Sequence, residues 1–97
     1  MSKEKGYEGW KSYETWLVAL WLGNEEGTYN LMQEFADEET ETCRLGDRIK
    51  DFIEEYNPCE ESGLYTDLLN AAISEVDFYE IAEHYMDEKA ERNKKKV

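Results

Sequence analysis

The sequence predicts an all-α protein, a compact bundle of about five short helices in a single domain. Apolar residues recur at spacings of three and four along most of the chain. No stretch alternates apolar and polar residues with β-branched side chains, as a strand would. No heptad pattern lasts beyond one helix, which argues against a long coiled coil. With 97 residues, the chain is long enough for one small domain with a modest core.

Three regions are expected along the chain. Residues 1–11 form an N-terminal arm, residues 12–88 form the helical body, and residues 89–97 form a basic flexible tail. The body contains all the helices, and the tail has little to bury.

The first helix is predicted over about Tyr13 to Leu22, with Ser12 as its N-cap. Gly23 is expected to end it as a left-handed C-cap, and Asn24 to cap the helix that follows. Its apolar residues fall at i, i+3, i+4, i+7 and i+8. We expect this stripe to face the core: Tyr13, Trp16, Leu17, Leu20 and Trp21.

The second helix is expected over about Glu25 to Asp37, and the third over about Thr40 to Tyr56. Glu25 and Glu26 suit the positive end of a helix dipole, and Asn57-Pro58 ends the third helix. The predicted inward residues are Leu31, Met32, Phe35 and Ala36 in the second helix, and Leu45, Ile49, Phe52, Ile53 and Tyr56 in the third.

Ser62 is expected to cap a fourth helix, and Asp77 and Glu80 form the capping-box pattern that opens a fifth. Both helices carry an apolar face. The apolar residues are Leu64, Tyr65, Leu68, Leu69 and Ala72 in the fourth helix, and Phe78, Ile81, Ala82, Tyr85 and Met86 in the fifth.

Charge is the strongest functional signal. The chain has a net charge of −13 at pH 7, and residues 24–88 hold twenty Asp and Glu against Arg44, Arg48 and Lys50. Such a surface repels nucleic acid and anionic membranes and attracts basic protein surfaces. We therefore expect no direct nucleic-acid binding and no membrane partner. The longest apolar run, residues 16–22, is too short to span a membrane. No signal-peptide pattern is present, so the expected location is the cytosol.

Few residues offer catalytic chemistry. His84, the single histidine, lies four residues from both Glu80 and Glu88. It is either an acid–base group tuned by those carboxylates or a half-exposed surface histidine, and the second interpretation is favoured. Cys43 and Cys59 form no zinc-binding pattern. Neither a calcium loop nor a glycine-rich phosphate loop is found. The sequence therefore predicts no enzyme, no cofactor and no metal.

Trp10 lies before the first helix and outside its stripe. It is either a hydrophobic lid on the bundle or an exposed anchor for a partner.

The acidity has two interpretations: plain solubility, or imitation of nucleic acid. A globule of this size is roughly 32 Å across, a length over which duplex DNA carries about 19 charges. The excess of 17 negative charges over residues 24–88 is of that order. The predicted partner-binding residues lie on the second and third helices: Glu34, Asp37, Glu38, Glu39, Glu41, Asp47, Asp51, Glu54 and Glu55.

Two stretches stand out: Tyr13-Glu-Thr-Trp16 with Ala19-Leu-Trp-Leu-Gly-Asn24, and Leu64-Tyr-Thr-Asp-Leu-Leu-Asn-Ala-Ala-Ile-Ser-Glu-Val-Asp77 with Ile81-Ala-Glu-His84. They resemble a family of small uncharacterised proteins of phages, plasmids and other mobile elements. The resemblance covers roughly residues 7–30 and 62–86 and leaves out residues 34–61. It implies no catalytic residues, but it implies a role in the contest between mobile elements and their hosts.

The leading hypothesis is a non-enzymatic binding protein in the host cytosol. It inhibits a CRISPR or restriction complex by occupying the basic surface of a host nucleic-acid-binding protein complex. The alternative is a helical interaction or homodimerising module that uses exposed aromatics near Trp10, with no mimicry. A third hypothesis is an enzyme that uses His84 with Glu80 or Glu88. The sequence leaves the oligomeric state open.

Overall fold

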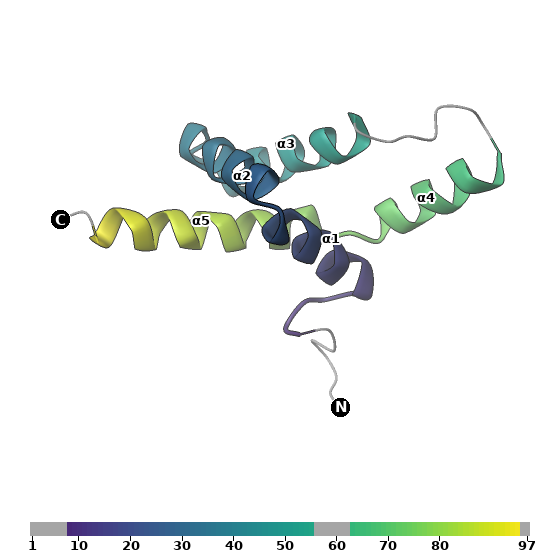
Figure 1. Cartoon of the computed structure of the whole chain (residues 1–97), viewed down its shortest axis with the longest axis horizontal. Helices are drawn as coiled ribbons and strands as arrows, with labels where there is room; N and C mark the ends of the chain where they lie inside the picture. Colours follow the sequence, from purple (N-terminus) through teal and green to yellow (C-terminus); the bar gives the residue numbers. More distant parts are fainter. Residues whose placement is uncertain (1–7, 56–62, 96–97) are drawn as a thin grey trace.

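The computed structural model describes residues 8–55 and 63–95, and within these ranges the chain forms five α-helices and no extended strand (Figure 1). The predicted all-α class is confirmed. The helices are α1 (Tyr13–Asn24), α2 (Glu26–Glu38), α3 (Thr42–Glu55), α4 (Leu64–Ser74) and α5 (Phe78–Lys95).

The core lies between α1, α2, α3 and α5, and the α3–α5 pair forms its most extensive contact. The predicted inward faces of the second, third and fifth helices are confirmed at every described position, since each of those residues is buried or packed against the core. Tyr56 lies outside the described residues. The buried apolar residues are Leu22, Met32, Ala36, Leu45, Ile49, Phe78, Ile81, Ala82 and Tyr85.

Gly46 allows α3 and α5 to approach closely. It is buried inside α3, and a Cβ at this position would lie 3.2 Å from the carbonyl oxygen of Phe78. The neighbouring atoms belong to the backbone of the first turn of α5, which has less freedom to move than a side chain. A glycine is therefore favoured here by packing rather than by a turn.

The predicted inward face of α1 is wrong. Thr15 and Leu22 are buried and Val18 packs against the core, whereas the side chains of Tyr13 and Trp21 are exposed. Leu20 is exposed as well, and Trp16 and Leu17 are half-buried. The residues after Glu14 are almost all apolar, so apolar spacing alone fits more than one face.

Two hydrogen bonds of Thr15 stabilise the orientation of α1 that buries Thr15. Ser12 is the N-cap as predicted, and its Oγ accepts a hydrogen bond from the Thr15 backbone N–H at 3.1 Å. The Thr15 hydroxyl oxygen accepts a bond of 2.8 Å from the Asp77 backbone N–H. A buried hydroxyl needs such partners, and these turn Thr15 toward α5.

The predicted boundary between α1 and α2 is also wrong. Gly23 lies within α1, Asn24 is its last residue, and Glu25 joins the two helices in an extended conformation without a side-chain cap. The hydroxyl of Thr28 donates a bond of 3.0 Å to the carbonyl of Leu22. This bond satisfies one carbonyl at the end of α1, a role that a glycine C-cap otherwise serves.

Only half of the predicted capping box is formed. Asp77 Oδ1 accepts a hydrogen bond of 3.0 Å from the backbone N–H of Glu80. The reciprocal bond is replaced by contacts with distant residues. The Asp77 backbone N–H donates to the hydroxyl oxygen of Thr15, and Glu80 Oε1 accepts a bond of 3.1 Å from the backbone N–H of Lys11.

Helix α5 extends well past the predicted boundary at Glu88. It ends at Lys95, so residues 89–95 are helical and do not form the expected tail. The Lys89 ammonium donates to the carbonyls of Ala36 and Glu39, at 2.8 and 3.1 Å. These carbonyls lie at the C-terminus of α2, where helical partners are missing and a cation is favoured.

Helix α4 is the least buried element. None of its residues is buried, and it makes no extensive contact with another helix. Its N-cap is Gly63, with φ of 153°, and Ser62 lies outside the described residues. In Figure 1 it projects away from the other four helices. Its predicted apolar face is therefore exposed, which the sequence did not indicate.

Candidate partner-binding surfaces

The nine acidic residues predicted to bind a partner lie on α2, on α3 and on the connection between them. Eight of them are exposed, and Glu39 is half-buried. The structure divides them into a group that is paired with cations and a group that is not.

The paired group surrounds the end of α2. Arg48 Nη1 lies 2.8 Å from Glu38 and 3.4 Å from Glu39, and its guanidinium lies 4.1 Å from the ring centre of Phe35. Asp37 pairs with Arg92 of α5 at 3.4 Å, and Glu41 pairs with Arg44 at 3.4 Å. Nearby cations thus reduce the negative charge that this group presents to a partner.

The other group makes no ion pair among the described residues: Glu34, Asp47, Asp51, Glu54 and Glu55. Four of these lie on α3 at i, i+4, i+7 and i+8, which places them on one face of a helix. That face is opposite Leu45 and Ile49, the buried residues of α3. We call these four residues the α3 acidic stripe: Asp47, Asp51, Glu54 and Glu55. Lys50, which is exposed, lies beside the stripe.

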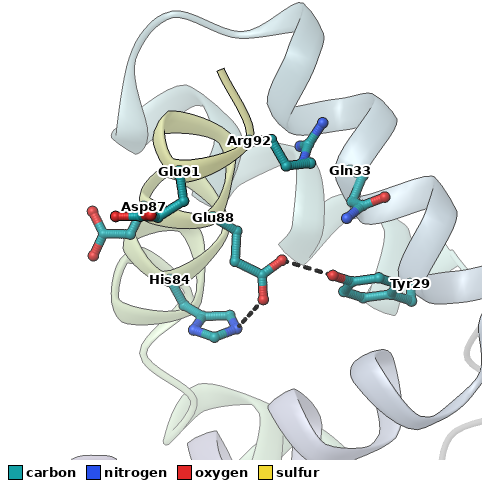
Figure 2. A pocket seen from close by; sticks show the side chains of 7 residues that line it. All are labelled: Tyr29, Gln33, His84, Asp87, Glu88, Glu91 and Arg92. Carbon is teal, nitrogen blue, oxygen red and sulfur yellow. Dashed lines mark hydrogen bonds and ion pairs between the residues drawn. The ribbon is translucent and has the colours of Figure 1, made fainter. Parts of the chain in front are cut away.

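His84 belongs to a hydrogen-bonded group between α2 and α5. Figure 2 shows Glu88 between two partners: Tyr29 donates to Glu88 Oε1 at 2.9 Å, and His84 Nε2 lies 3.1 Å from Glu88 Oε2. The bond to Glu88, together with burial, raises the pKa of Tyr29. The neighbouring Tyr85 is buried, which raises its pKa to about 12. Both phenols are therefore neutral near pH 7, and the Tyr29 hydroxyl donates its proton to Glu88.

A shallow hollow of about 430 Å³ adjoins this group. The described residues that line it are Tyr29, Gln33, His84, Asp87, Glu88, Glu91 and Arg92, and none of these is a Ser, Thr or Cys that could act as a nucleophile. The His84 side chain is 46% exposed. The arrangement joins α2 to α5 and leaves His84 at the surface.

Trp10 is half-buried and packs against the core. Its ring meets His84 edge-on, with 5.6 Å between the ring centres. Its position fits the predicted lid, while the role of a partner anchor stays a prediction.

A second exposed aromatic surface lies on α1, and the sequence did not point to it. Trp21 of α1 is 64% exposed and lines an apolar groove of about 1170 Å³ between α1, α2 and α3. We call this the α1–α2–α3 groove. Its principal apolar residues are Leu17, Val18, Trp21, Leu31, Phe52 and Ile53. The available signal was the number of apolar residues in α1, which exceeds what one buried face can hold.

No three His, Cys, Asp or Glu side chains within residues 8–55 and 63–95 are grouped so that they could hold a metal ion. Across these same ranges, no helix has the length and apolar character needed to cross a membrane.

Comparison with known proteins gives one match. The model of a family of unknown function, DUF7249, matches residues 3–93. It includes residues 34–61, which the resemblance seen in the sequence left out. No match was found among the curated proteins or among the solved structures. The chain belongs to the family of unknown function DUF7249.

Proposed function

We propose that this protein is a non-enzymatic acidic binding protein of a mobile element. It inhibits a host CRISPR or restriction complex by occupying a site that normally holds nucleic acid. The observation that carries the proposal is the α3 acidic stripe, because its four carboxylates share one face and make no ion pair among the described residues.

The spacing of the stripe supports this proposal. From Asp47 to Glu55 the helix rises about 12 Å. One strand of DNA carries a phosphate about every 3.4 Å, so it presents about four negative charges over the same length. Four carboxylates on one helical face therefore match the charge density of a single strand. The paired group at the end of α2 contributes less, since Arg48, Arg44 and Arg92 offset it.

The proposed mechanism is competition. Lys and Arg side chains of the host complex form charge-assisted hydrogen bonds with the stripe in place of phosphates. Long-range attraction by the net charge of −13 raises the association rate, and salt weakens it. Nothing in this mechanism requires catalysis by His84, and its partner Glu88 accepts the hydrogen bond from Tyr29 that links α2 to α5.

The test compares two variants with the same change in net charge. One reverses the stripe, with Asp47, Asp51, Glu54 and Glu55 replaced by Lys. The control reverses four exposed residues of the α4–α5 connection and α5: Glu75, Glu83, Asp87 and Glu91. Each protein is immobilised and exposed to host lysate, then washed at low and at high salt.

We expect the parent and the control to retain a nucleic-acid-binding complex that salt and added duplex DNA release. The stripe variant should retain none of it, while its circular dichroism stays helical. Equal retention by the stripe variant would contradict the proposal, as would a partner that added DNA does not displace.

A second candidate function is a helical interaction module without mimicry. The exposed α1–α2–α3 groove favours it, because monomeric proteins rarely expose large continuous apolar surfaces unless these bind something. Association through this surface would resist high salt, in contrast to association through the stripe.

A further inference from the structure

Two apolar surfaces are left uncovered by the described residues. The first is the α1–α2–α3 groove, where Trp21 is 64% exposed and Glu25 is the one charged residue among the described residues of the lining. Its volume of about 1170 Å³ exceeds that of a usual small-molecule pocket. An open apolar groove between helices is the kind of surface that receives the apolar face of another helix.

The second surface is the face of α4. Leu64, Tyr65 and Leu68 are 68%, 75% and 58% exposed, and they follow one another at i, i+1 and i+4. Leu69 and Ala72 extend the same face by one turn. Eleven residues of helix are about 16 Å long. Helix α4 thus has the amphipathic pattern of a helix that packs into a groove.

Charge allows these two surfaces, in particular, to meet. Copies of a chain with a net charge of −13 repel one another over most of their surface. Helix α4 carries a single carboxylate, Asp67, whereas α2, which has only two more residues, carries four. A contact between α4 and the groove therefore brings two copies together where few like charges face each other.

The connection at the end of α4 favours a second copy over the helix's own groove. Glu75 O accepts a hydrogen bond of 3.0 Å from Ser12 Oγ, and the Asp77 N–H donates to Thr15. These bonds fix the connection against the N-terminal half of α1, and α4 leaves it pointing away from the body (Figure 1). To enter its own groove, α4 would have to reverse direction within this hydrogen-bonded connection.

We propose that two copies of the chain form a dimer in which α4 of each copy lies in the α1–α2–α3 groove of the other. Such an exchange is symmetric, so every contact occurs twice. It leaves the α3 acidic stripe out of the interface. The proposed dimer is consequently independent of the proposed inhibitory function, and an experiment can refute either proposal without refuting the other.

The first test is the mass in solution by light scattering over a range of concentrations. We expect twice the chain mass of 11.5 kDa, and equal or tighter association at high salt, because salt screens the repulsion between copies. Leu68→Glu and Trp21→Glu should each weaken association by at least about tenfold. Tyr79→Glu is the matched control, since Tyr79 is an aromatic residue of α5 that is 50% exposed. It should leave the dimer intact.

The second test identifies the occupant of the groove by disulfide formation, with Cys43 and Cys59 replaced by Ser. A chain carrying Leu68→Cys is mixed with a chain carrying Trp21→Cys, and a third chain carries both. We expect a cross-link between the two single variants, and from the double variant a product of twice the chain mass. A cross-linked monomer would show that α4 fills its own groove and would overturn the proposal. A chain that stays monomeric at every concentration would do so as well.

Discussion

Helices α3 and α4 look alike in the sequence and differ in the structure. Each has an apolar face with leucines, yet Leu45 of α3 is completely buried while Leu68 of α4 is 58% exposed. Helix α3 has Gly46, which lets α5 approach, and a partner helix that covers its apolar face. Helix α4 has no such partner among the five described helices. The difference teaches that an amphipathic pattern identifies a face that can be buried, and does not identify what covers it.

The sharpest test of this comparison removes one leucine from each helix. Leu45→Ala leaves a cavity in the core and should lower the free energy of unfolding by about 2–5 kcal/mol. Leu68→Ala removes a mostly exposed side chain and should cost less than about 0.5 kcal/mol in the monomer. Urea unfolding at a concentration below that of dimer formation measures both. Equal losses would mean that α4 is packed in solution as firmly as α3.

A second experiment weakens the junction between the packed body and α4. Thr15→Val keeps the shape of the side chain but leaves the Asp77 N–H without its acceptor. We expect a loss of about 1–3 kcal/mol in unfolding free energy. Thr15→Ser retains the hydroxyl and loses one methyl group, so it should cost only about 1 kcal/mol. If the valine variant is the more stable of the two, the hydrogen bond does not hold this junction.

The third and smallest effect is a pH dependence at the same junction. The Lys11 ammonium donates to Asp77 Oδ2 at 2.9 Å and lowers the pKa of Asp77 below its usual 3.8. The ion pair therefore stabilises the folded protein at pH values above the unfolded-state pKa of Asp77. This stabilisation is lost as the pH falls through the folded-state pKa of Asp77.

Asp77→Asn keeps a capping side chain but lacks this carboxylate. The difference in melting temperature between parent and variant should stay constant from pH 5 to 7 and shrink below about pH 4. Asp51→Asn serves as the control, because Asp51 is an exposed residue of α3 that makes no ion pair with another described residue. A difference between parent and Asp77→Asn that does not change with pH would remove Lys11 from the explanation.

The fold could be predicted where charged residues mark the solvent face. In α3, apolar residues lie on one face of the helix and carboxylates on the opposite face. Both the buried face and the exposure of Asp47 and Asp51 could therefore be predicted from the sequence. In α1, Glu14 is the one charged residue, and apolar spacing allowed several faces. A buried threonine decided between them through a bond to Asp77, 62 residues away.

The candidate acidic surface on α2 and α3 could also be predicted only in part. Helical phase indicated which carboxylates are exposed, but not which are paired. Arg48 and Arg92 reach Glu38 and Asp37 across 10 and 55 residues of sequence, and only the packing of α3 and α5 against α2 brings them together. The binding role of the α3 acidic stripe stays a prediction.

The exposure of Trp21 has a consequence for how this molecule can be observed. An indole that already stands in water in the folded state changes little in emission when the chain unfolds, whereas covering it changes its surroundings completely. Trp10 and Trp16 are also only half-buried. Unfolding should therefore change the emission of Trp10 and Trp16, which are partly buried, whereas a partner that covers α1 should change the emission of Trp21.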